Sequence, residues 1–312
     1  MPSLADELDR TEYPFRSQYE SIGGESMHFI DEGEGDPVVM VHGNPTWSFY
    51  YRRLAADLKA THRVIVPDHI GCGLSSKPGH GDYPFTRERR IEDLETLLER
   101  RGVTGRVTWI VHDWGGAIGL GVATKIPERV RRLVILNTSA FGLPEGKKFP
   151  FLLWWIRHTP LGPFLVQGLN AFVRGTLAIG CRLRKISPEA RRGYLAPYHD
   201  WAARTAVLRF VRDIPRRFSD PSWDTLIEVE RRLSRLHEVP VQLFWGDRDP
   251  VFDRAFRLSW KKRYPDQETH LFPEGGHLIL EDAYETILPH IRRFLGDEEN
   301  FWRPGTMEVH DR

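Results

Sequence analysis

Five short apolar runs alternate with helical patterns, and this alternation constrains the fold of the 312-residue chain more than any other feature. The runs occupy 37–43, 62–68, 107–113, 130–138 and 239–247. Strands that are apolar throughout must be buried on both faces, as happens when helices cover both sides of a mostly parallel sheet. Segments 86–102 and 282–296 repeat apolar residues at helical spacing and end on glycines. The sequence therefore predicts an α/β fold.

The alternation breaks between residue 138 and the run at 239, where helical segments and prolines follow one another without a convincing strand. We interpret 143–222 as a helical cap inserted into one core, which consists of 1–142 and 223–298. The last residues, 299–312, are interpreted as a C-terminal tail. The cap holds 14 Lys or Arg and 5 Asp or Glu, a net charge of +9, while the rest of the chain carries −8. This charge indicates either a solvated face or a docking surface for an acidic partner or anionic lipid headgroups.

Overall composition narrows the class of protein. The 44 basic and 43 acidic side chains nearly cancel, so the chain has no overall bias toward nucleic acid. The first ten residues lack the pattern of a secretion signal, and no apolar run is long enough to cross a bilayer. Cys72 and Cys181 lie far apart and form no disulfide or zinc pattern. We expect a soluble, cytoplasmic protein that uses neither a metal nor a cofactor.

Polar motifs follow the ends of the predicted strands, where open α/β sheets gather their chemistry. The motifs read HGNPTW from residue 42, HDWGG from 112, GDRDPVF from 246 and GGHLILED from 275. A strand, a glycine turn and a helix are how α/β hydrolases expose a nucleophile, normally the serine of G-x-S-x-G. Here the central residue is Asp113. The chain order Asp113, Asp249, His277 matches the order of nucleophile, acid and histidine in these enzymes.

Other residues of the same type could take the place of two members of this triad. Asp247 and Asp253 flank Asp249, but the turn pattern G-x-x-D after the strand favours Asp249, and Asp247 is expected to shape the turn. His277 is favoured by its position between Gly276 and an apolar segment, after the last acid. The other histidines considered, which we expect to be structural, are His62, His158, His270 and His290.

The carboxylate at the nucleophile position predicts the type of reaction. A carboxylate attacks carbonyl carbon poorly but can displace a leaving group from saturated carbon and form an alkyl ester. His277, oriented by Asp249, would activate water to hydrolyse that ester, with the backbone N–H groups of Asn44 and Trp114 holding the oxyanion. The Asn44 amide and the Trp114 indole N–H are neutral donors that could hold a departing anion without a metal.

The motifs HGNP, HDWGG, GDRD and GGH together resemble the haloalkane dehalogenases, in which Asn and Trp hold the halide. The stretch LNTSAF, after the strand ending at 138, has no acid, so the chain is similar to the third subfamily, with its acid at Asp249. Less generic stretches (66–78, 133–141 and 196–215) look like the β-lactone decarboxylases of bacterial long-chain olefin biosynthesis. This resemblance implies an α/β-hydrolase fold and conversion of a cis-3,4-dialkyl oxetan-2-one into a cis-alkene and CO2.

Several alternatives stay open at this point. A haloalkane dehalogenase would use the same residues, and attack by Asp113 on the alkyl or on the carbonyl carbon of a lactone cannot be distinguished. An epoxide hydrolase would use two cap tyrosines, for which Tyr194 and Tyr198 are available, but Asn44 argues against it. A ligand receptor without enzymatic activity would not need the complete triad.

The substrate is expected to be a small apolar molecule. The cap segments 151–156 and 162–173 could line a tunnel for its alkyl chains or pack into the core of the cap itself. The basic cap predicts assembly with the β-lactone-forming enzyme, or peripheral contact with a membrane.

Overall fold

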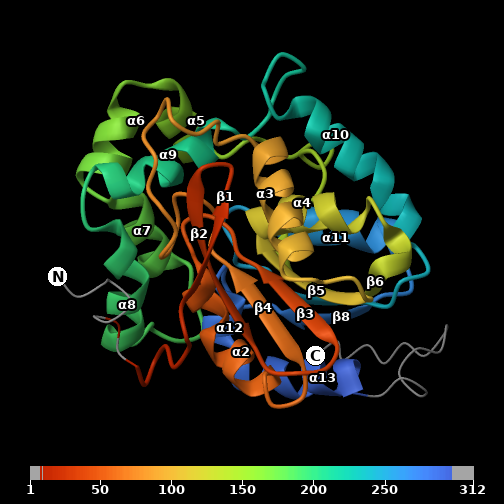
Figure 1. Ribbon diagram of the computed structural model, residues 1–312. Helices are drawn as coiled ribbons and strands as arrows, with labels where there is room; N and C mark the ends of the chain where they lie inside the picture. Colours follow the sequence, from red (N-terminus) through yellow and green to blue (C-terminus); the bar gives the residue numbers. More distant parts are fainter. Residues whose placement is uncertain (1–7, 9, 297–312) are drawn as a thin grey trace.

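The computed structural model describes Leu8 and residues 10–296, so the predicted tail at 299–312 lies outside the described residues (Figure 1). Its central sheet has eight strands in the order β1-β2-β4-β3-β5-β6-β7-β8. The strands are β1 (Gln18–Ile22), β2 (Glu25–Glu32), β3 (Pro37–Val41), β4 (Arg63–Pro67), β5 (Val107–Asp113), β6 (Val130–Thr138), β7 (Val241–Gly246) and β8 (Glu268–Phe272).

The five predicted strands are β3 to β7, and from β4 to β8 every neighbouring pair is parallel. The sequence patterns missed β1 and β2, which form an antiparallel hairpin that joins the sheet against β4. They also missed β8, an edge strand whose residues are mostly half-buried or exposed. The mostly parallel α/β fold is confirmed.

Helices cover both faces of the sheet (Figure 1). Alternate residues of β3 show this, because Val38 and Met40 pack in one apolar core while Val39 and Val41 pack in the other. The first core is closed by α2 (Arg52–Leu58), α12 (Ile279–Asp282) and α13 (Tyr284–Gly296). The second is closed by α3 (Arg87–Arg100), α4 (Trp114–Ala123), α10 (Trp223–Arg232) and α11 (Arg254–Arg263). In the described part of the chain, every helix is too short or too polar to cross a membrane.

Residues 143–222, all of which the structure describes, form helical segments without a strand. The helices lie together on the left of Figure 1 and are α5 (Phe151–His158), α6 (Leu161–Pro163), η3 (Phe164–Gly168), α7 (Ala171–Ile179), α8 (Pro188–Leu195), η4 (Ala196–Tyr198), η5 (Ala202–Arg204) and α9 (Thr205–Arg212). Arg184 pairs with Glu285 of α13 at 2.6 Å, and Lys147 pairs with Asp253. Some of the positive charge of this segment is thus used in contacts with the acidic core. Its separation from the core as a cap stays a prediction.

Candidate functional site

The turn between β5 and α4 presents Asp113 at the carboxyl edge of the sheet. Asp113 has φ 52° and ψ −126°, a strained conformation for a residue with a side chain. Gly115 and Gly116 follow, and a Cβ atom on them would lie 1.9 Å from the Val41 carbonyl oxygen and 2.0 Å from Thr138 Oγ1, respectively. Glycine is therefore required for α4 to begin directly against β3 and β6. The turn has the strand–glycine–helix geometry that the sequence predicted.

The Asp113 carboxylate is buried and accepts two backbone hydrogen bonds. The N–H of Asn44 donates to Asp113 Oδ1 at 2.5 Å, and the N–H of Trp114 also donates to the carboxylate. Oδ2 lies 3.8 Å from His277 Nε2. Burial raises the pKa of Asp113 to about 6, although the His277 charge and the two N–H groups oppose this rise. At neutral pH the group remains predominantly a carboxylate.

His277 lies between Asp113 and Asp249. Its Nδ1 contacts Asp249 Oδ2 at 2.7 Å. Burial alone would lower the pKa of His277, but the charge of Asp249, its hydrogen bond and the charge of Asp113 raise that pKa to about 9. The imidazole is therefore protonated at neutral pH, and the three side chains form an alternating array of negative, positive and negative charge.

The two neighbouring acids have other partners. Asp247 forms an ion pair with Arg257, with an Oδ1 to Nε distance of 3.0 Å, and Asp253 accepts the N–H of Ala255 at the start of α11, also at 3.0 Å. Asp249 alone of these three acids contacts His277. The role of Asp249 as the acid of the triad stays a prediction, and the structure brings Asp249 to His277.

Asn137, at the end of β6, is a residue that the sequence reasoning missed. Its Nδ2 donates to Asp249 Oδ2 at 3.1 Å and to the Gly246 carbonyl at 2.9 Å, while its Oδ1 accepts the Gly246 N–H at 2.8 Å. It stands in the stretch LNTSAF, where the absence of an acid was noted. The Asn137 amide thus holds the Asp249 carboxylate in place from the neighbouring strand. The sequence signal that could have found Asn137 is a polar residue near the end of an apolar strand.

The array opens into a cavity of about 340 Å³. Asn44 and Trp114 both line it, so the predicted nucleophile, histidine and anion-binding pair meet in one space. Asn44 Nδ2 uses one hydrogen on the Val207 carbonyl at 3.2 Å, which leaves the second for another acceptor. Most of the remaining wall is apolar, including Phe141, Phe149, Leu153, Ile156, Leu165, Val166, Phe172, Val211, Ile214, Leu226, Val251 and Phe252.

Arg87 is a second residue that sequence reasoning missed. It lines the same cavity, and its guanidinium lies 4.7 Å from the centre of the Trp114 ring. Among the described residues no carboxylate forms an ion pair with this guanidinium, whose Nη1 donates to the Ser222 carbonyl at 3.4 Å and whose buried Nε makes no hydrogen bond. Asp213 accepts the backbone N–H of Arg87 instead. Burial lowers the pKa of Arg87 to about 10, although the charge of Asp213 opposes this fall, so the guanidinium beside the cavity is charged at neutral pH.

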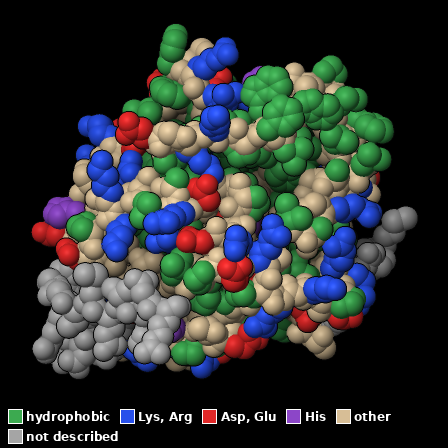
Figure 2. All heavy atoms as spheres, turned by 180° about the vertical axis from the view of Figure 1, so that it is seen from behind, with side chains coloured by type: hydrophobic (Ala, Val, Ile, Leu, Met, Phe, Trp, Pro, Cys, Tyr) green, Lys and Arg blue, Asp and Glu red, His purple; other side chains and the backbone are tan. Residues whose placement is uncertain are grey.

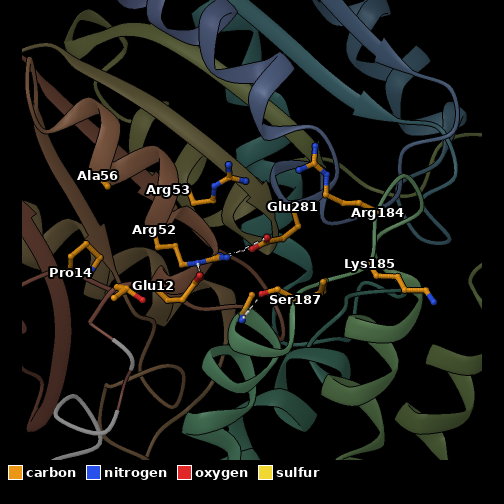
Figure 3. A pocket seen from close by; sticks show the side chains of 12 residues that line it. Glu12, Pro14, Arg52, Arg53, Ala56, Arg184, Lys185, Ser187 and Glu281 are labelled. Atoms are coloured by element: carbon orange, nitrogen blue, oxygen red, sulfur yellow. Dashed lines mark hydrogen bonds and ion pairs between the residues drawn. The ribbon is translucent and has the colours of Figure 1, made fainter.

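A second cavity, of about 480 Å³, is lined in part by charged side chains, of which Arg52 pairs with Glu12 and Glu281 (Figure 3). Arg52 contacts both Glu12, at 2.9 Å, and Glu281. The Tyr194 hydroxyl donates to Glu281 at 2.7 Å. These contacts join α2, α8 and α12, and we interpret them as structural.

The two cap tyrosines do not serve the first cavity. Tyr194 is held by Glu281, and both Tyr194 and Tyr198 are buried away from the residues that line the space around Asp113. An epoxide hydrolase needs such tyrosines to protonate the substrate oxygen, so their position argues against that activity.

Comparison with known proteins identifies the family. A family model described as alpha/beta hydrolase fold matches residues 36–284. The chain belongs to the α/β hydrolase fold family. A Shewanella oneidensis relative in this family, named cis-3-alkyl-4-alkyloxetan-2-one decarboxylase, is 46% identical over 92% of this chain and 90% of its own length. A Xanthomonas campestris protein of the same name is 40% identical over 87% of this chain and 93% of its own length.

The α/β hydrolase fold is also seen in solved structures. A haloalkane dehalogenase from Agrobacterium tumefaciens C58 superimposes with a TM-score of 0.79 at 25% identity, covering 90% of this chain and 96% of its own. Together these relatives confirm the resemblance to dehalogenases and oxetanone decarboxylases.

The charge array predicts a measurable effect on His277. Asp249→Asn should lower the titration midpoint of His277 from about 9 by about 1 to 3 pH units. Burial lowers the pKa of His277, and in this variant only the charge of Asp113 is left to oppose it. A ¹⁵N-resolved NMR titration of the histidine side chains measures this midpoint. Asp247→Asn is the matched control and should leave it unchanged, since Asp247 pairs with Arg257. An unchanged midpoint in Asp249→Asn would contradict the assigned pairing.

Proposed function

We propose that this protein is a cis-3-alkyl-4-alkyloxetan-2-one decarboxylase, which converts a β-lactone into a cis-alkene and CO2. Two relatives with this name cover most of the chain. The structural support for the proposal is Arg87, a buried cation that lines the cavity beside Trp114 and whose guanidinium forms no direct ion pair with a carboxylate among the described residues. A β-lactone releases a carboxylate when its ring opens, and a guanidinium matches a carboxylate in charge and shape.

The proposed reaction balances without water. Asp113 Oδ2 attacks C4 of the ring, the C4–O bond breaks, and its electrons pass to the ring carboxylate, which Arg87, Asn44 and Trp114 hold. The bond from C3 to the carboxylate then breaks and releases CO2. Its electron pair forms the C=C bond while the ester bond to Asp113 breaks and regenerates the carboxylate. His277, protonated at neutral pH, stabilises that carboxylate as it leaves.

The hydrogen bonds of Asp113 favour attack at C4 over attack at the lactone carbonyl. The N–H of Asn44 donates to Asp113 Oδ1, which becomes the carbonyl oxygen of the alkyl ester. Attack on the carbonyl would place negative charge on an oxygen of the substrate, and these N–H groups are already taken by the nucleophile. Displacement inverts C4, and elimination of the anti-oriented CO2 and Asp113 then gives the cis-alkene from the cis-lactone.

The apolar cavity supports substrates with long alkyl chains. Its wall includes Leu152, of which 61% is exposed, so the cavity reaches the molecular surface. Around that point large apolar side chains gather on α5, α6 and η3, at the upper right of Figure 2. The exposed members of this apolar face are Phe151, Leu152, Trp154, Leu161 and Phe164. An alkyl chain longer than the cavity would continue along this face.

Haloalkane dehalogenation is the second candidate, because the same nucleophile and anion-binding pair would serve it. It requires His277 to act as a base toward water after the ester forms. The raised pKa of His277 disfavours this role in the resting enzyme, although loss of the Asp113 charge on esterification would lower it again.

We also propose that the cap contacts the β-lactone-forming enzyme, and that the protein works in the cytoplasm. The exposed basic side chains Lys148, Arg174 and Lys185 support the first proposal, as does the exposed apolar face of α5, α6 and η3. The free thiols of Cys72 and Cys181 agree with the second. If reversing these three cap charges leaves both pulldown of that enzyme and liposome sedimentation unchanged, electrostatic docking of the cap is excluded.

The proposed activity is tested by giving purified protein a cis-3,4-dialkyl β-lactone and, separately, a long-chain iodoalkane. Alkene, alcohol and iodide are quantified in both reactions. We expect cis-alkene at a rate far above any iodide release, because the cavity cation matches a carboxylate better than a halide. Rapid iodide release without alkene would instead identify a dehalogenase.

Arg87 provides a separate prediction. Arg87→Met should lower kcat/KM for the β-lactone by about 10²-fold, the typical loss on removing one charge-stabilising donor, and Arg87→Lys should restore part of it. Arg89→Met is the matched control, because Arg89 lies on the same helix but pairs with Asp93. Its rate should equal that of the wild type. A folded Arg87→Met variant with wild-type kcat/KM would remove Arg87 from the mechanism.

A further inference from the structure

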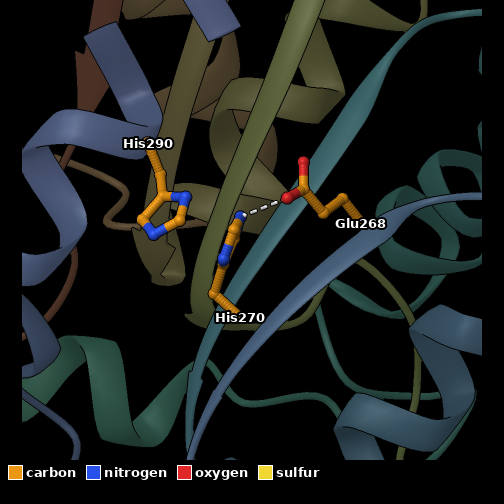
Figure 4. A group of neighbouring side chains, drawn as sticks. All are labelled: Glu268, His270 and His290. Atoms are coloured by element: carbon orange, nitrogen blue, oxygen red, sulfur yellow. Dashed lines mark ion pairs between the residues drawn. The ribbon is translucent and has the colours of Figure 1, made fainter. Parts of the chain in front are cut away.

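Two histidines and a glutamate meet where β8 begins (Figure 4). Glu268 and His270 lie two residues apart on β8, so their side chains leave the same face of the sheet. His290 reaches them from α13. One ligand atom from each of the three lies within 4.8 Å of the other two. His277 follows the opposite end of β8, so this cluster is separate from the proposed catalytic site.

The facing nitrogens of the two imidazoles lack directed hydrogen bonds. His270 Nε2 and His290 Nδ1 are both buried and make none. His270 Nε2 lies 3.2 Å from Glu268 Oε1, the ion pair dashed in Figure 4. The His270 and His290 rings lie 4.1 Å apart between their centres. Imidazole nitrogens beside a carboxylate are donors that bind transition metals.

Neighbouring side chains already hold the donors in place. Gln242 of β7 is paired in register with Glu268, and its Nε2 donates to Glu268 Oε2 at 2.5 Å. The other carboxylate oxygen of Glu268 is thereby directed toward His270. The His270 ring stacks on Phe244, with 4.5 Å between ring centres and 12° between planes. Outer contacts of this kind orient the ligands in known metal sites.

We propose that Glu268, His270 and His290 bind a divalent transition-metal ion, with Zn²⁺ as the best match. Two imidazole nitrogens and one carboxylate oxygen are a common zinc ligand set, in which water completes the tetrahedron. Calcium and magnesium prefer sites made of oxygen ligands. The Glu268 side chain is 44% exposed, so ions reach the site from solvent. The bound ion joins the edge strand β8 to the last described helix, α13.

The test uses the full chain without a histidine tag, freed of metal and titrated with zinc against a chromophoric chelator. We expect one equivalent to bind. Glu268→Gln and His290→Gln should each weaken binding tenfold or more, while His237→Gln, at an exposed histidine outside the cluster, should not. Zinc should raise the unfolding temperature of the wild type and of His237→Gln but of neither cluster variant.

Two further readouts keep the result decisive. The unfolding temperatures of the metal-free variants show whether each is folded, and Co²⁺ substitution should give the visible absorption of a four-coordinate site in the wild type. Absence of stoichiometric binding by the wild type, or unchanged binding in both folded cluster variants, would overturn the proposal.

Discussion

The site depends on keeping two carboxylates and an imidazolium together where water is nearly excluded. An isolated buried charge costs several kcal/mol, so the array persists only because opposite charges alternate and each carboxylate accepts N–H donors. Those donors follow different strands: Asn44 follows β3, Trp114 follows β5, Asn137 ends β6, and Val251 and Phe252 follow β7. Parallel strands in this order are what bring the donors to one edge of the sheet.

The same arrangement limits the reactions open to Asp113, the proposed nucleophile. One oxygen of Asp113 is held by the Asn44 N–H, while the other faces His277 and the cavity. In the proposed mechanism Oδ1 keeps its hydrogen bond to the Asn44 N–H throughout. Oδ2 attacks C4 of the lactone and is later released from C4 when the ester bond breaks. A protonated His277 suits a carboxylate that must act as a leaving group, whereas hydrolysis needs a neutral imidazole. In the same proposal Arg87 supplies positive charge for the second carboxylate, which is that of the opened lactone.

The sequence predicted the elements whose physical signal is strong and local. Strands β3 to β7 are apolar throughout because helices cover both of their faces, and the motifs at their ends pointed to the residues that the structure brings together. β8 was missed because an edge strand needs no continuous apolar run, and its sequence ETHLF alternates with polar residues. The hairpin of β1 and β2 left a signal that was not used, the two glycines between Ile22 and Glu25.

The missed side chains could not have been found from local pattern. Arg87 begins a predicted helix and resembles the exposed arginines beside it, because sequence spacing does not show that its guanidinium turns inward to Trp114. The cluster of Glu268, His270 and His290 joins strand β8 to helix α13. A loop and the short helix α12 separate these two elements in the sequence, so only tertiary packing brings His290 to His270. Such contacts depend on tertiary structure alone.

In the proposed mechanism Asp113 forms an alkyl ester that is resolved by loss of CO2 and not by water. Many turnovers of a cis-β-lactone in H2¹⁸O, followed by mass spectrometry of the peptide that contains Asp113, test this directly. We expect continued cis-alkene formation with no ¹⁸O in the Asp113 carboxylate, because neither bond from Cγ of Asp113 to its carboxylate oxygens is broken. Incorporation of ¹⁸O into Asp113 during turnover would contradict it and indicate hydrolysis.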